Sequence, residues 1–80
     1  MPLTQMNNNE SGVVKHIEGG RRAVERLSAL GIRPGKVLRK ISSHFWKGPV
    51  TVMLDKNRIA IGHGMAHKII VETEVKNESA

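Results

Sequence analysis

The chain has 80 residues, no cysteine and a formal net charge of +6, because 13 lysines and arginines outnumber 7 aspartates and glutamates. This length corresponds to one small domain, which buries only about 60% of its unfolded surface and must use most of its apolar positions as core. Without cysteine, neither a disulfide framework nor a thiolate metal site can supplement that core.

The positive charge favours an anionic partner, such as nucleic acid, a membrane surface or an acidic protein face. An ordinary solvated surface is the alternative, since the basic residues are spread from Lys15 to Lys76 without a dense run. No apolar run approaches the roughly 20 residues of a membrane span, and residues 1–10 lack the pattern of a signal peptide. We therefore expect a soluble cytoplasmic protein, in keeping with the lack of cysteine.

The first part of the chain predicts a tail, a strand and a helix. Residues 1–10 are rich in asparagine and have little to bury, which predicts a disordered N-terminal tail. A short strand is expected at residues 12–17. Over residues 21–30, apolar residues recur at i, i+3 and i+4 and predict a helix with one apolar stripe, which consists of Ala23, Val24, Leu27 and Leu30.

The stretch from Leu27 to Gly35 ends this helix and turns the chain into a strand. Gly31 follows the last periodic residue, where glycine accepts the left-handed backbone of a helix stop without steric cost. Pro34 cannot continue a helix, and with Gly35 it forms a strong turn pair. We expect this segment to shape the fold rather than to carry chemistry.

The second part predicts four more strands, at residues 36–42, 49–54, 58–61 and 68–72. Leu38 and Ile41 break strict alternation in the second strand of the chain, so we expect a β-bulge there. Residues 55–57 have turn chemistry and predict a hairpin. Residues 62–67 predict a turn or a single 3₁₀-like turn, and residues 73–80 are polar.

Short strands separated by closely spaced turn signals favour a closed barrel, because closure removes exposed strand edges. The predicted fold class is mainly β with one helix: a small five-stranded SH3-like barrel, capped by the α-helix between strands 1 and 2. The barrel domain would span residues 11–74, and residues 75–80 would form a frayed C-terminal tail.

The pattern of glycine, proline and apolar residues over about residues 12–72 resembles the FeoA family, small cytoplasmic proteins that accompany the ferrous iron transporter FeoB in bacteria. No single piece of the pattern is specific, but its order and spacing are. The matching residues are Arg26-Leu27, Leu30-Gly31-Ile32, Pro34-Gly35, Gly48-Pro49 with Val50 and Val52, Ile59-Ala60-Ile61, Ala66, and Ile69 with Val71.

The resemblance implies an SH3-like barrel without catalytic activity that regulates ferrous iron uptake as an adaptor. Its partner would be the cytoplasmic GTP-binding portion of FeoB, which would bring it to the inner face of the cytoplasmic membrane. The matching residues specify shape and do not name a site. A related domain occurs in metal-dependent repressors of the diphtheria-toxin-repressor type, but this chain has no room for their DNA-binding and dimerisation parts.

Residue chemistry argues against an enzyme. The single aspartate, Asp55, lies in the predicted hairpin turn, and the glutamates are scattered without a close pair. General acid–base and nucleophilic catalysis need convergent groups that shift one another's pKa. We therefore expect no catalytic residues and no cofactor, apart from weak binding of a transition metal ion.

The candidates for that metal are His63 and His67, which are four residues apart and would share one face of a helix. Gly62 and Gly64 disfavour a helix there, and no carboxylate lies nearby in sequence, although ferrous iron would want oxygen ligands beside imidazole. Three interpretations stay open: a physiological site, adventitious binding and plain surface histidines.

Two sets of residues are candidates for partner binding. Phe45 and Trp46 are adjacent aromatics in a predicted loop, where one ring either shows a face to a partner or plugs an open end of the barrel. Arg22 and Arg26 lie four residues apart beside the apolar stripe of the helix, on either a contact surface or an ordinary solvated face.

The alternative function is that of a nucleic-acid-binding small basic barrel. One Phe, one Trp and no Tyr are few for base stacking. Salt dependence distinguishes the two functions, since a polyanion binder loses affinity for random DNA steeply as salt rises. The sign of any effect on transport and the oligomeric state do not follow from the sequence.

Overall fold

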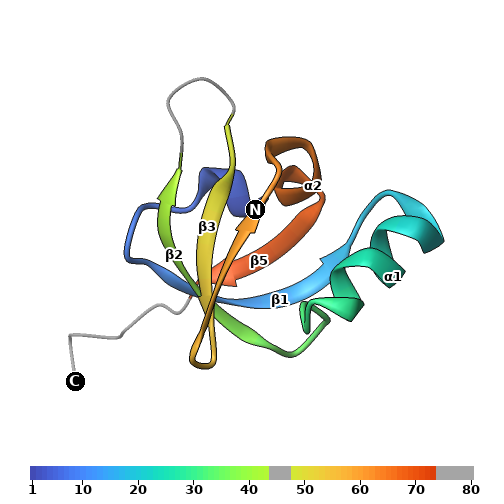
Figure 1. Cartoon of the computed structure of the whole chain (residues 1–80), viewed down its shortest axis with the longest axis horizontal. Coiled ribbons are helices and arrows are strands. Elements are labelled where there is room, and N and C mark those ends of the chain that lie inside the picture. The colour runs from blue at the N-terminus through green and yellow to red at the C-terminus, as the bar shows by residue number, and fades with distance from the viewer. Residues whose placement is uncertain (44–47, 74–80) are drawn as a thin grey trace.

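The computed structural model describes residues 1–43 and 48–73, and within them five strands form one antiparallel sheet of order β4-β3-β2-β1-β5 (Figure 1). The expected mainly-β chain with a helix between the first two strands is confirmed. The elements are η1 (Leu3–Gln5), β1 (Ser11–Ile17), α1 (Gly20–Ala29), β2 (Val37–Ser43), β3 (Val50–Leu54), β4 (Asn57–Ile61), α2 (His63–His67) and β5 (Ile69–Thr73).

Helix α1 ends as its sequence predicts. The Gly31 N–H donates to the Ser28 carbonyl at 2.9 Å, and the Ile32 N–H donates to the Leu27 carbonyl at 2.9 Å. These two bonds form a Schellman motif, which requires a left-handed residue, and Gly31 supplies it with a φ of 88°. Ile32 and Leu27 are both buried in the core beside the motif. The stop therefore ties the end of α1 to the barrel.

The predicted bulge and hairpin are also present. The register of β2 against β3 shifts between Lys40 and Ser42, which leaves Ile41 as the extra residue. Strands β3 and β4 pair from Val50 with Ile61 to Leu54 with Asn57, and a two-residue turn that begins at Asp55 joins them. Asp55 has a φ of 56°, a value that aspartate tolerates in tight hairpins.

The prediction of a turn or 3₁₀-like turn at residues 62–67 is wrong, because His63–His67 forms a short α-helix, α2. Its Ala66 N–H donates to the Gly62 carbonyl at 2.8 Å, and the Ala66 side chain is fully buried in the core. Packing of Ala66 offsets the helix cost of Gly64, which is why local propensity failed here.

The prediction of a disordered tail at residues 1–10 is also wrong. Leu3 is fully buried and Met6 is 3% exposed, and both belong to the main core cluster. The Met1 carbonyl accepts a hydrogen bond from the Val71 N–H at 2.7 Å, so the segment also lies against β5. Two apolar side chains among polar neighbours were too few to show a buried segment in the sequence.

A buried lysine holds this N-terminal segment in place. Lys40 on β2 is 2% exposed, and its Nζ donates to the carbonyls of Thr4 at 3.0 Å and Met6 at 2.7 Å. Burial lowers the pKa of Lys40, and the nearby charge of Glu10 opposes that shift in part. Because the ammonium group bonds backbone carbonyls of residues 1–10, the bulge strand and the N-terminal segment are fastened together.

The core lies inside the curved sheet, and its buried apolar residues come from every described strand and from η1, α1 and α2. Within the described residues, no helix is long and apolar enough to cross a membrane. The residues proposed for the frayed C-terminal tail, 75–80, lie outside the described part of the chain.

Candidate partner-binding groove and histidine pair

Helix α1 covers the sheet with only half of its predicted apolar stripe. Ala23 is 3% exposed and Leu27 is 1% exposed, whereas Val24 is 40% and Leu30 is 48% exposed. Figure 1 shows the reason, since α1 lies at one end of β1 and projects away from the rest of the sheet. Large apolar side chains of α1 therefore face solvent.

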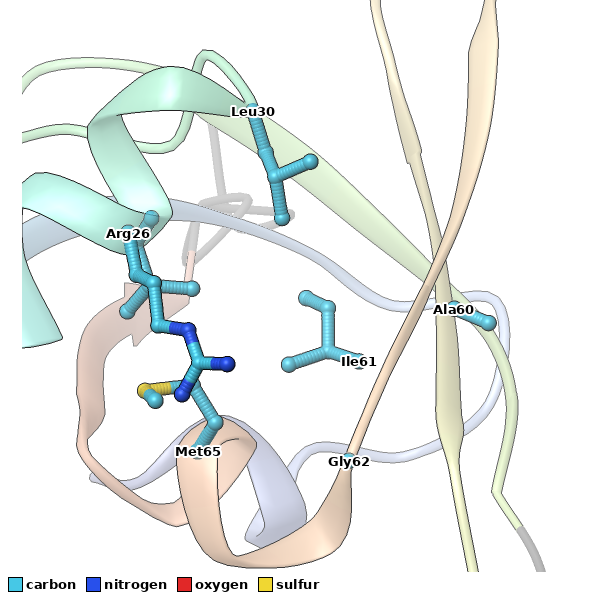
Figure 2. Close-up of a pocket in the computed structure, with 7 residues that line it drawn as sticks. Arg26, Leu30, Ala60, Ile61, Gly62 and Met65 are labelled. Atoms are coloured by element: carbon cyan, nitrogen blue, oxygen red, sulfur yellow. The ribbon is translucent and has the colours of Figure 1, made fainter.

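A groove of about 290 Å³ separates the C-terminal half of α1 from β4 and α2. We name it the α1–β4 groove; its walls are Arg26, Leu27, Leu30, Ala60, Ile61, Gly62 and Met65. In Figure 2, Leu30 extends from α1 and Ile61 extends from β4 into the same hollow. The groove is thus a largely apolar hollow that is large enough to accept one or two side chains of a partner.

Arg26 supplies the charged part of this groove. In Figure 2 its guanidinium extends across the hollow toward Met65 on α2. Arg26 and Arg22 also line a second, shallow hollow with Glu25 on the outer face of α1. Ion pairs found in the described part of the chain include Arg21 with Glu25 at 3.9 Å, but neither Arg22 nor Arg26. Both arginines are exposed and available to an acidic partner.

The structure brings the predicted pair Arg22 and Arg26 together on α1, and it places Arg26 beside apolar residues that the sequence did not single out. The sequence places Leu30 in the apolar stripe of the helix and Ile61 in the family pattern, and it gives neither of them a binding role. A usable signal existed in the stripe itself, because Val24 and Leu30 widen it beyond what a barrel this small covers. Phe45 and Trp46 lie outside the described residues.

The histidine pair lies on α2, next to the groove. The His63 and His67 rings are stacked, with centroids 6.5 Å apart and planes inclined by 12°. Thr4 Oγ1 lies 3.0 Å from His67 Nδ1, so the N-terminal segment contacts one of the two rings. In the described ranges, no cluster of three or more His, Cys, Asp or Glu side chains is placed to hold a metal ion.

Two further charged pairs lie away from these features. Asp55 pairs with Lys36 at 3.4 Å at the hairpin turn, and His16 lies 3.8 Å from Glu18 at the end of β1. Both pairs have largely exposed side chains, where ion pairs contribute little to stability. Among the residues that the structure describes, we take the α1–β4 groove and the α2 histidines as the candidate binding features.

Comparison with known proteins identifies the family. The FeoA domain model matches residues 1–73, a range that includes the N-terminal segment. The chain is 39% identical over 71 residues to a Methanocaldococcus jannaschii protein provisionally named Fe(2+) transport protein A, which covers 89% of this chain and 84% of the relative.

Solved structures agree with this match. The crystal structure of an iron uptake regulatory protein (FeoA) superposes with a TM-score of 0.84 and 31% identity, over 92% of this chain and 96% of that one. The solution structure of FeoA from Chlorobium tepidum has a TM-score of 0.85 at 19% identity, over 98% of this chain and 74% of that one, and supports the fold alone. The expected SH3-like fold is confirmed, and the chain belongs to the FeoA family, a family associated with ferrous iron transport.

Proposed function

We propose that this protein is a non-enzymatic adaptor that regulates ferrous iron uptake by binding the cytoplasmic GTP-binding portion of an FeoB-type transporter. It would act in the cytoplasm and reach the inner face of the membrane through that partner. Membership of the FeoA family supports a role in ferrous iron transport, and the α1–β4 groove is a surface on this chain through which such binding can occur.

The observation that carries the proposal is the uncovered apolar surface beside the groove. Leu30 is 48% exposed and stands at the groove mouth, although a small domain gains stability by burying such side chains. Exposed apolar residues that line a hollow with a polar rim mark protein–protein contact sites. A partner side chain of similar size would fill the groove and bury the exposed part of Leu30.

The positive charge beside the groove favours a partner with an acidic side chain. Arg26 lies across the groove and Arg22 lies one turn earlier on α1, so an acidic side chain beside an apolar one would satisfy both parts of the surface. Arginine is enriched at binding hot spots because its planar group pairs with carboxylates while its stem packs on apolar surface. Electrostatic attraction would mainly raise the association rate.

The test is calorimetric titration of this protein into the isolated GTP-binding domain of FeoB from the same genome. Leu30→Ser and Arg26→Glu are each expected to weaken binding by about tenfold or more, as truncation of a central contact does. GTP hydrolysis should be measured in parallel, since the adaptor alone is expected to hydrolyse none.

Val37→Ser is the matched control, because Val37 is 49% exposed but lies on β2, away from the groove. It should leave the affinity unchanged. An equal loss of affinity in Leu30→Ser and Val37→Ser would overturn the assignment of the groove. No binding by the unaltered protein would overturn the assignment of the partner. Salt-sensitive binding to random DNA in its place would support a nucleic-acid function.

A further inference from the structure

The starting observation is that α2 is helical despite its glycine. Residues four apart on a helix lie on one face, with Cβ atoms about 5–6 Å apart. His63 and His67 occupy these positions, and their rings are nearly parallel with centroids 6.5 Å apart. The structure thus supplies the arrangement that the sequence alone left in doubt.

Both rings are reachable from solvent. His67 is exposed and His63 is half-buried, so neither ring is fixed by packing on all sides. Metal–imidazole bonds are about 2.0–2.1 Å long, and the two ring nitrogens must therefore approach within about 4 Å of each other. Rotation about the side-chain torsions of such residues is fast and provides this movement.

Thr4 adds a contact of the kind that metal-bound histidines make. Its Oγ1 lies 3.0 Å from His67 Nδ1. When the Nδ1–H donates to this hydroxyl, the proton resides on Nδ1 and the Nε2 lone pair is free for a metal ion. Partners of this type fix the tautomer and orientation of metal-bound histidines. Lys40 holds the Thr4 carbonyl at 3.0 Å, which fixes the position of Thr4 in turn.

From this geometry we propose that His63 and His67 form a two-imidazole site for a divalent transition-metal ion, with Thr4 as the residue that orients His67. The ion belongs to the class that prefers imidazole, such as Zn²⁺, Ni²⁺ or Cu²⁺. Two protein ligands leave the other coordination positions to water. The inference rests on α2 and η1 and does not depend on FeoB binding.

The test uses the full chain and Zn²⁺ alone, because Zn²⁺ leaves NMR spectra sharp and permits calorimetry on the same samples. One equivalent of Zn²⁺ should shift the ring signals of His63 and His67 and the backbone signals of Thr4 and α2. Thr4→Val should weaken Zn²⁺ binding by about tenfold, the lower end of the range for loss of an orienting partner.

Ligand variants decide between this site and scattered binding. His63→Gln and His67→Gln should each remove the calorimetric signal, whereas His16→Gln, on β1, should leave it unchanged. Equal weakening by all three variants would show nonspecific binding and overturn the proposal. An unchanged Zn²⁺ affinity in the double variant His63→Gln with His67→Gln would also overturn the proposal.

A variant in which one histidine is moved tests whether the spacing of the two histidines matters, or only their number. The double variant Gly62→His with His63→Gln keeps two histidines on this segment but places them five residues apart. A Cβ atom at position 62 meets no heavy atom within 4 Å, and the φ of −55° there is ordinary, so the variant is expected to fold. Zn²⁺ binding should be lost. Retained binding would show that the one-turn spacing is irrelevant.

Discussion

The N-terminal segment and helix α1 reverse the order of burial that their sequences suggest. Residues 1–10 are mostly polar, yet Leu3 is fully buried, whereas α1 has a strong apolar stripe and leaves Leu30 48% exposed. The difference is one of position. Residues 1–10 lie against the barrel, and α1 projects from its end (Figure 1). Amphipathicity therefore identifies a helix, but its partner decides how much of the apolar face is covered.

The largest expected effect comes from comparing two leucines. Leu3→Ala should lower the free energy of unfolding by about 3 kcal/mol, because it removes a fully buried side chain from a packed core. Leu30→Ala should cost less than about 1 kcal/mol, since Leu30 is 48% exposed. Urea unfolding followed by circular dichroism measures both. A larger loss from Leu30→Ala would mean that the contrast between the two regions is wrong.

The second comparison concerns how the N-terminal segment is fastened. Lys40→Ala should cost about 2 kcal/mol, because it removes a buried side chain and leaves the carbonyls of Thr4 and Met6 without their donor. Lys36→Ala, which breaks an exposed ion pair with Asp55, should change stability by about 0.5 kcal/mol or less. Faster amide exchange at residues 3–6 in Lys40→Ala would locate the damage, and unchanged exchange would contradict the fastening role.

Two glycines that look alike in sequence should respond with opposite signs. Gly31→Ala should destabilise the protein by about 1–2 kcal/mol, because the position has a φ of 88° and the new Cβ would lie 3.1 Å from Leu54. Gly64→Ala should stabilise it by about 0.5–1 kcal/mol, since α2 is helical there and the added methyl meets no atom within 4 Å. Thermal melts of both variants give the sign directly, and the same sign for both would show that one backbone is misassigned.

The smallest expected effect is a pH dependence of the contribution that Lys40 makes to the free energy of unfolding. Burial lowers the pKa of Lys40 in the folded state below its usual value of 10.5, so the unfolded chain binds the proton more tightly. Stability must then rise as pH increases from the lowered pKa toward 10.5. Unfolding of the natural protein and of Lys40→Met between pH 7 and about 10.5 should show this rise only with Lys40 present. A parallel pH profile in the two proteins would exclude it.

The sequence by itself determined the elements whose signals are local. The helix stop at Gly31 and the hairpin turn at Asp55 depend on left-handed backbone conformations that few residues adopt. The bulge at Ile41 shows in the sequence as a break in strand alternation, and all three features are present. The family resemblance includes Gly31 among its glycine, proline and apolar positions, and the match to the FeoA domain confirms it. Arg22 and Arg26 were also placed together correctly, since their spacing on a helix is fixed.

Tertiary structure decided what each element packs against. Leu3 and Met6 are buried because the curved sheet leaves room for residues 1–10 and Lys40 supplies donors for their carbonyls. Helix α2 forms because Ala66 is buried, a contact that no local propensity contains. The α1–β4 groove likewise unites residues more than thirty positions apart in the chain. Burial and apposition depend on contacts distant in sequence, and only the folded chain specifies them.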